Sequence, residues 1–279
     1  MEKILLAIDA VNPDTSALDF ACYVGRLTHS RVTGIFLENL VAEKTPVLIG
    51  GGELSYLDWK IDLNSPDHDA KLKIIEKNIT LFKTACESRS VEYKIHRDRN
   101  LPAHEIINES RYADLLIIDA ATSFNKRFEG IPTEFVKDVL KDAECPVIIS
   151  PETFHGIDEI IFAYSNTKSC AFALKQFTYL FPMLKDKKTV VLQVNEKGKS
   201  ANPDKYNFSE WLSNHYPLAT FEMLKGDEKY GLFDYLFKRK NIIIVMGAYG
   251  RTALSRFFHH SHADRLISTV TQPIFISHY

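Results

Sequence analysis

A pattern of short apolar runs separated by helical segments occurs twice along this 279-residue chain. Of all the features of the sequence, this duplication most restricts the folds that the chain can adopt. The runs are about five residues long, and the segments between them show apolar residues at helical spacing. The runs of the first copy are 3–9, 31–37, 91–96, 113–120 and 146–150. The runs of the second copy are 158–164, 188–194, 220–224, 241–247 and 273–277. The last runs, PVIIS and PIFIS, are closely similar, which supports a true repeat.

Continuous apolar strands that alternate with helices indicate a parallel sheet covered by helices on both faces. Right-handed crossovers then favour a doubly wound, Rossmann-like sheet. We therefore predict an α/β fold with two tandem domains, 1–152 and 156–279, each built on five parallel strands. We also expect the two final runs to pair with each other, because short apolar edge strands need covering. The two halves would then form a pseudo-twofold pair within one chain.

The first copy carries an insertion. Ile4 matches Ile160 at an offset of 156, whereas Pro146 matches Pro273 at an offset of 127, so the first copy is about 29 residues longer. The extra residues are placed at about 41–66, a segment that includes the triplet Gly50–Gly52. A phosphate-binding P-loop requires a Lys-Ser or Lys-Thr pair after its last glycine. Glu53 follows here, so a flexible loop or a hairpin turn is the preferred interpretation.

Charge and composition argue against several classes of partner. The chain has 34 basic and 36 acidic residues and no basic block, whereas a nucleic-acid-binding protein usually has a basic face. No apolar run approaches the roughly 18 residues of a membrane helix, and the first run is too short for a signal peptide. The widely spaced cysteines fit reduced thiols. We expect a soluble cytoplasmic protein that binds neither nucleic acid nor membrane.

The segment 246–268, MGAYGRTALSRFFHHSHADRLIS, holds the strongest local motif. Gly247 and Gly250 follow the fourth strand of the second copy, and glycine lets backbone N–H groups approach an anion closely. Ser261 stands at the expected start of a helix, where it can cap the helix or donate to a phosphate. The alternative interpretation is a tight turn after a buried strand.

With this motif in its tandem setting, the chain resembles the double-domain universal stress proteins over nearly its whole length. The resemblance implies the adenine nucleotide alpha hydrolase-like fold. ATP-binding members carry an Asp after the first strand, and Gly-x-x-Gly, nine residues, Gly and Ser or Thr after the fourth. On this resemblance Gly247, Gly250 and Ser261 would hold phosphates, and Val194 on the second strand would lie beside adenine. Ser165 replaces the first-strand Asp.

The second copy departs from the family pattern at a further position, because His260 stands where the family has its third glycine. Its imidazole would either clash with a phosphate or donate a hydrogen bond to it. His259, His260, His262 and Asp264 are close in sequence, but no distant fourth ligand is evident. Metal sites normally need three or four converging side chains, so we expect no metal.

The first copy resembles a nucleotide site that has been lost. It keeps Asp9, but Ala120 and Ser123 stand in place of the two glycines and Glu134 in place of Ser261. A carboxylate at a phosphate position opposes binding electrostatically, and Asp119 adds a further charge. We therefore expect a structural or regulatory role for this copy. The aromatic residues expected to fill its vacated crevice are Phe124, Phe128 and Phe135.

These features predict a stress-response protein that acts as a ligand-sensing or interaction module for a protein partner still to be identified. ATP or a related adenine nucleotide would bind in the second copy. No nucleophile elbow and no recognisable catalytic triad is present, so an enzyme is not favoured. Two alternatives stay open: a structural, partner-binding pair of domains with no nucleotide, and a slow nucleotide hydrolase.

Overall fold

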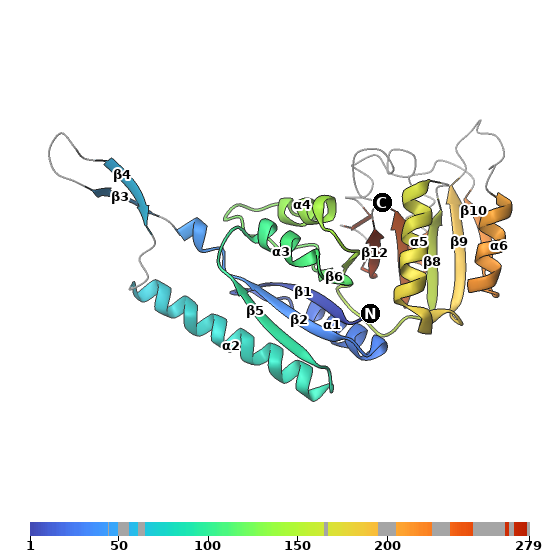
Figure 1. Ribbon diagram of the computed structural model, residues 1–279, viewed down its shortest axis with the longest axis horizontal. Coiled ribbons are helices and arrows are strands. Elements are labelled where there is room, and N and C mark those ends of the chain that lie inside the picture. The colour runs from blue at the N-terminus through green and yellow to red at the C-terminus, as the bar shows by residue number, and fades with distance from the viewer. Residues whose placement is uncertain are drawn as a thin grey trace.

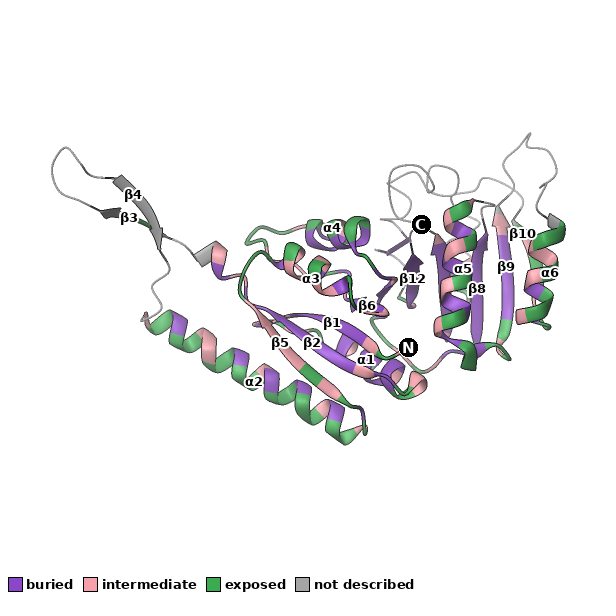
Figure 2. Cartoon of the chain, viewed as in Figure 1, coloured by how far each residue is buried: buried purple, intermediate pink, exposed green. Residues whose placement is uncertain are grey.

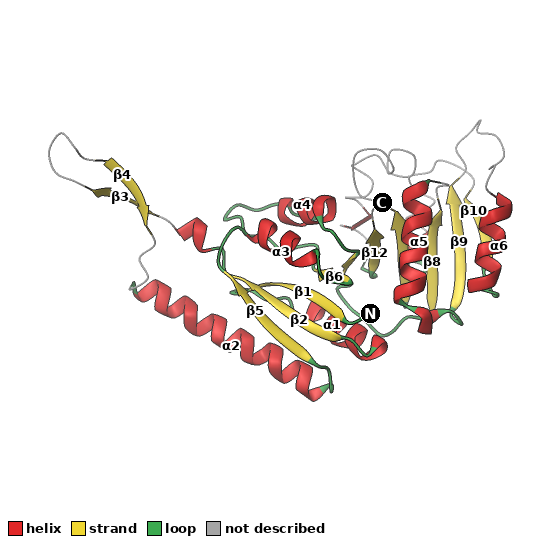
Figure 3. Cartoon of the chain, in the orientation of Figure 1, coloured by secondary structure: helices red, strands yellow, loops and turns green. Residues whose placement is uncertain are grey.

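The computed structural model describes residues 1–43, 45–49, 56–60, 65–164, 167–194, 205–224, 235–247, 266–267 and 271–277. Within these ranges the chain forms one ten-stranded sheet with helices on both sides, and a separate two-stranded sheet (Figures 1 and 3). The predicted α/β class is therefore confirmed. No helix in the described part of the chain is both long and apolar enough to cross a membrane.

The first half supplies five strands to the large sheet. Its elements are β1 (Lys3–Asp9), α1 (Thr15–Thr28), β2 (Arg31–Leu37), a 3-10 turn (Leu40–Glu43), β3 (Thr45–Ile49), β4 (Tyr56–Lys60), α2 (Pro66–Ser88), β5 (Tyr93–Asp98), α3 (Pro102–Ser110), β6 (Leu115–Ile118), α4 (Glu134–Asp142) and β7 (Val147–Ile149). The strand order is β5-β2-β1-β6-β7, and all four of these pairings are parallel.

The second half repeats this plan. Its elements are β8 (Glu159–Tyr164), α5 (Lys168–Leu180), a 3-10 turn (Pro182–Leu184), β9 (Lys188–Val194), α6 (Lys205–His215), β10 (Thr220–Leu224), β11 (Ile242–Gly247) and β12 (Ile274–Ser277). The strand order β10-β9-β8-β11-β12 matches that of the first half strand for strand. Both halves are thus doubly wound, as the sequence predicts.

The two halves join through their last strands. β7 and β12 pair antiparallel, with Ile149 opposite Ile274 and Val147 opposite Ile276. This is the edge pairing expected from PVIIS and PIFIS, and it makes one continuous sheet from two five-stranded units. Backbone groups that would be exposed at the edge of either unit alone are used in this ladder.

The core lies on both faces of the sheet because successive strand residues point to opposite sides. Ile4 and Ile117 are buried on one face, and Leu5 and Ile118 on the other. Figure 2 shows the large-sheet strands mostly in the buried colour and the outer sides of the helices exposed. Burial on both faces explains why the strand sequences are apolar throughout rather than alternating.

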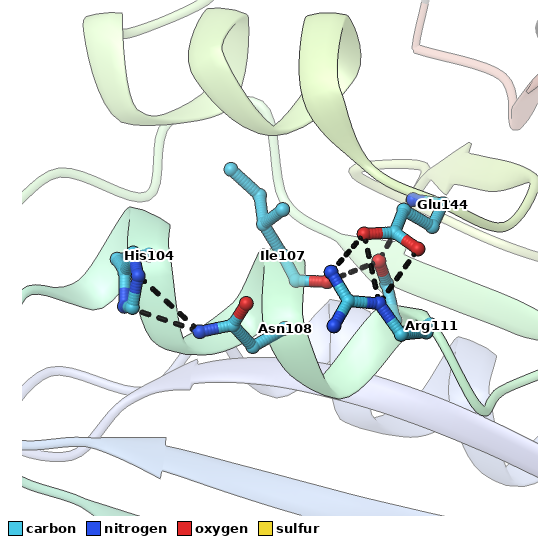
Figure 4. A network of polar contacts seen from close by, with 6 residues as sticks. His104, Ile107, Asn108, Arg111 and Glu144 are labelled. Atoms are coloured by element: carbon cyan, nitrogen blue, oxygen red, sulfur yellow. Dashed lines mark hydrogen bonds and ion pairs between the residues drawn. The ribbon is translucent and has the colours of Figure 1, made fainter.

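A polar network fixes α3 against the end of α4 on the outside of the first half (Figure 4). The guanidinium of Arg111 donates to both carboxylate oxygens of Glu144, at 2.6 and 2.9 Å. The backbone N–H of Glu144 donates to Ser110 Oγ at 2.8 Å, and that hydroxyl donates to the carbonyl of Ile107. The network closes the corner that leads into β7, and therefore into the seam between the halves.

The predicted insertion contains a hairpin, β3–β4, which extends away from the large sheet in Figure 1 and agrees with the hairpin that the sequence left open. One element differs from the sequence interpretation. The helix α6 was not predicted, because Leu212 is its only fully buried apolar residue in the described part and its apolar periodicity is weak. The sequence instead placed a helix at 227–238, most of which lies outside the described residues.

Candidate functional site

Each half has a point where the connections leave the sheet in opposite directions. In the first half this point lies between β1 and β6, and in the second between β8 and β11. Open α/β sheets bind ligands in the crevice at the carboxyl ends of such strands. The two crevices are therefore the places to compare.

The first-half crevice is an open cavity of about 350 Å³. Ile8 of β1, Phe36 of β2 and Phe82 of α2 are among its apolar lining residues. Asn12, Pro13 and other residues of the β1–α1 connection line it as well. The cavity lies within the size range of small-molecule sites, roughly 300–1,000 Å³, and it combines apolar walls with converging polar groups.

Three carboxylates line this first-half crevice. The carboxylate of Asp9 accepts the backbone N–H groups of Val11 and Asn12, at 2.8 and 3.2 Å, and so shapes its own loop. Asp14 caps α1 by accepting the N–H of Ala17. Burial raises the pKa of Asp119 to about 6, and the charge of Asp14 adds to the rise. No Lys, Arg or His is among the described residues that line the cavity.

The β1–α1 connection is held in place from the opposite wall. Asn78 of α2 donates from Nδ2 to the carbonyls of Ala10 and Val11, both at 2.9 Å. Asn78 itself lines the cavity. The sequence reasoning missed this residue, although a signal was present: Asn78 is a polar residue on the helix side that carries the buried Ile75, Ile79 and Phe82.

In the second half, the first turn of α5 lies close to the end of β11. The connection from β8 to α5 is three residues, 165–167, against five residues, 10–14, in the first half. A Cβ on Gly247 would lie 2.6 Å from the backbone nitrogen of Cys170 and 2.7 Å from the carbonyl carbon of Ser169. The first turn of α5 thus packs directly on the end of β11. Gly247 has a packing role whether or not a ligand binds beside it.

Aromatic packing fills the neighbouring space in the second half. Tyr164 at the end of β8 stacks on Phe208 of α6, with ring centroids 4.1 Å apart and planes 11° from parallel. At the strict repeat offset, Tyr164 stands where the first half has Ile8. The aliphatic Ile8 lines the first-half cavity, whereas the larger Tyr164 packs on an aromatic ring of α6.

The strand registers correct one alignment made from the sequence. Ile4 is opposite Leu115 in the first half, and its counterpart Ile160 is opposite Ile243 in the second. The offset between the fourth strands is therefore 128 rather than 127. Gly247 corresponds to Asp119, and not to Ala120. The sequence interpretation applied the offset of the last strands, 127, to the fourth strands as well. The segment between the fourth and last strands is, however, one residue shorter in the second half, so the two offsets differ by one.

The structure brings together part of the predicted first-copy set. Asp9 and Ser123 line the cavity with Asp119. Ala120 is buried among residues on the other face of the sheet. Glu134 begins α4, is largely exposed and pairs with Lys137 at 2.8 Å, away from the cavity lining. The hypothesis that Glu134 repels a ligand inside this crevice is therefore not supported by its position.

The predicted aromatic plug is wrong. Phe124 and Phe135 pack edge to face at 4.8 Å, on the opposite side of the sheet from Ile8 and Phe82. Phe128 is fully exposed. None of the three lines the crevice, because the chain after β6 carries them towards α4 instead.

Most of the predicted second-copy site lies outside the described residues. This holds for Ser165, Gly250 and Ser261, and for the side chain of Val194, which ends β9. The histidine-rich residues His259, His260 and His262, with Asp264, lie there too. Within the ranges that are described, no group of three His, Cys, Asp or Glu side chains is arranged to hold a metal ion.

Solved structures share this tandem architecture. A universal stress protein from Archaeoglobus fulgidus superposes with a TM-score of 0.65 at 17% identity, covering 99% of this chain and 98% of that one. Two Pseudomonas aeruginosa proteins, one of them described as functionally unknown, give TM-scores of 0.60 and 0.57. Their sequences are 13% and 14% identical to this one. Each match covers 100% of this chain, and it covers 93% of the first protein and 92% of the second.

Sequence comparison adds nothing to this structural likeness: no protein-family model matches the chain, and no curated protein does so either. The likeness spans both halves, and it agrees with the fold that the repeat predicts. The chain therefore has the tandem fold of the universal stress proteins.

Proposed function

We propose that this protein is a ligand-sensing module that binds a small organic molecule in its first-half crevice and passes the bound state to a protein partner. The observation that carries the proposal is the open cavity of about 350 Å³ at the first switch point, with apolar walls and converging polar groups. The sensing role is the one expected from the sequence. The site with the better support, however, is in the half that the sequence interpretation regarded as lost.

The charges around the cavity restrict the ligand. Asp9, Asp14 and Asp119 line it, and no cationic side chain is among its described lining residues. Two like charges about 4 Å apart repel by roughly 4 kcal/mol at an effective dielectric constant near 20. A phosphate group would meet this repulsion with no compensating cation. The crevice therefore favours a neutral or cationic ligand about the size of a nucleoside.

Titration with adenosine, AMP and ATP, followed by calorimetry, tests the site and its charge preference. Affinity is expected to fall in that order as phosphate charge is added. Ala121→Trp places a large ring at an exposed lining position and should abolish binding, whereas Ala70→Trp, exposed on α2 outside the lining, should not. Tighter binding of ATP than of adenosine, or binding unaffected by Ala121→Trp, would contradict the proposal.

A second candidate is ATP or a related adenine nucleotide in the second half. The observation that favours it is Gly247, which puts neither a carboxylate nor a side chain where the first half has Asp119. The first turn of α5 lies against it, and helix N-termini favour anions. By the family resemblance, Ser165, Val194, Gly250 and Ser261 would complete the site.

The first-half and second-half sites can be distinguished by variants that block one site and leave the other intact. Binding of one ATP per chain, lost in Gly250→Val and kept in Ala121→Trp, would support the second-half site. If freshly purified protein carries no small molecule by native mass spectrometry and none of the three probes binds, the structural, partner-binding alternative gains support. Release of phosphate from bound ATP would instead favour the hydrolase alternative.

A further inference from the structure

Two cysteine thiols are in contact inside the first half. Cys22 of α1 and Cys86 of α2 lie with their sulfur atoms 3.8 Å apart, both in the core between the helices and the sheet. The other two cysteines are placed differently: Cys145 is buried on the opposite face, and the thiol of Cys170 donates to the carbonyl of Ala163. None of the four is in a disulfide bond, and Cys22 and Cys86 are the pair whose sulfur atoms are in contact.

The Cys22 side of this pair faces a surface groove. The groove has a volume of about 400 Å³, and Cys22, Arg26 and Arg89 are among its lining residues. Arg89 is anchored there, donating to the carbonyl of Ala85 and to the carboxylate of Asp19. Cys22 is buried directly beneath this groove, with 1% of its surface exposed, and Cys86 lies behind it, fully buried.

The surroundings also favour the reactive form of Cys22. The hydrogen bond from the Cys86 thiol lowers the pKa of Cys22, and the charge of Arg89 lowers it further, whereas burial and Asp19 act in the opposite direction. The thiolate is the nucleophilic form of cysteine. The position of Cys22 on the groove side of the pair agrees with a role as the attacking sulfur, and the Cys86 sulfur lies within reach of it.

We propose that Cys22 and Cys86 form a peroxide-reactive dithiol site that closes to an intramolecular disulfide. The Cys22 thiolate attacks hydrogen peroxide, the O–O bond breaks, and Cys22 sulfenic acid and hydroxide form. The Cys86 sulfur then attacks the Cys22 sulfur, the S–O bond breaks, and the Cys86 proton leaves in water. Hydroxide takes up the proton first lost by Cys22. Two thiols are oxidised, and one peroxide is reduced to two waters.

The geometry allows this bond with a small movement. A disulfide bond is about 2.0 Å long, so the sulfurs must approach by about 1.8 Å, starting from 3.8 Å. Cys22 lies one helical turn beyond Leu18, and Cys86 one turn beyond Phe82, and both of those residues line the first-half crevice. The disulfide would tie together the two helices that form walls of that crevice.

Peptide mapping of the full-length protein by mass spectrometry, after brief treatment with hydrogen peroxide and alkylation of free thiols, tests the proposal. The expected product is a linked Cys22–Cys86 peptide pair that dithiothreitol separates, with Cys145 and Cys170 still alkylated. Cys86→Ser should instead accumulate sulfenic acid on Cys22, which dimedone traps. Cys145→Ser is the matched control and should form the disulfide as the wild type does.

The wild-type result alone can overturn the proposal, so it does not depend on the variants folding. Four alkylated cysteines at a peroxide dose that oxidises free glutathione would show that the site does not react. Oxidation of Cys145 or Cys170 before the pair would also overturn it, as would a Cys22–Cys86 link that forms only in denaturant. None of these readouts depends on which ligand the crevice binds.

Discussion

Gly247 shows how one residue can be explained by packing and by binding at once. The sequence predicted it as part of a phosphate loop, and the structure places backbone atoms of α5 against it. Because the closest atom to an added Cβ would be the backbone nitrogen of Cys170, no side-chain rotation can relieve the contact. The glycine is therefore required by the fold before any ligand is considered.

Gly247→Ala is expected to destabilise the protein by about 1–3 kcal/mol, the usual cost of overpacking. Urea unfolding followed by circular dichroism would measure this cost. Gly130→Ala is the matched control, because nothing lies within 4 Å of a Cβ at that position and its backbone is not in the left-handed region. Equal stability of the two variants would show that α5 yields easily.

Asp119 should make stability depend on pH. Its pKa rises from 3.8 in the unfolded chain to about 6 in the fold, chiefly through burial. As pH rises from about 4 to 6, the unfolded chain has already released this proton while the folded chain still holds it. Asp119 therefore lowers the free energy of unfolding across that interval, and the loss persists above pH 6.

Asp119→Asn removes this ionisation and keeps an acceptor for the N–H of Ala121, which Asp119 Oδ2 accepts at 2.9 Å. The variant is expected to be more stable than the wild type at pH 8, by about 1–3 kcal/mol from 1.36 kcal/mol per pKa unit. The difference should vanish near pH 4. Urea unfolding at both pH values tests this, and a gain of equal size at both would contradict it.

At the scale of elements, the crevice depends on α2 holding the β1–α1 connection. Asn78→Leu keeps the size of the side chain but leaves the carbonyls of Ala10 and Val11 without their donor. The expected cost is about 1–3 kcal/mol for the unsatisfied buried acceptors, together with weaker binding of adenosine. Asn108→Leu, on the exposed side of α3, should change stability by less than about 0.5 kcal/mol. Similar effects of the two variants would show that Asn78 does not organise the crevice.

The same elements show what the sequence could and could not predict. The spacing of the apolar residues and the order of the strand and helix segments were sufficient to predict five strands in each half, because buried parallel strands are apolar throughout and easily recognised. The open crevice was not predictable in this way. Its first-half lining includes the β1–α1 connection, which is two residues longer than its counterpart, and Ile8, which stands in place of Tyr164, and neither difference has a visible consequence in the sequence until α2 and α6 are positioned. The one-residue change of offset before the last strand was equally hidden, since Pro146 and Pro273 align well by themselves.

At the scale of the whole molecule, the antiparallel pairing of β7 and β12 joins both halves in one sheet. The seam residues Ile148 and Phe275 are fully buried. Because unfolding either half would expose this seam in the other, we expect a single cooperative transition in differential scanning calorimetry. Two separate transitions would show that the seam contributes little to the stability of its neighbours.

The antiparallel seam has a further consequence for communication. Strands within each half run parallel, and the two halves run in opposite directions. The carboxyl ends of β1 and β6 therefore do not lie beside those of β8 and β11, and Figure 1 shows β1 running obliquely and β8 upright. The two crevices therefore open in different directions, and any coupling between ligands bound in them would have to pass through the shared strands.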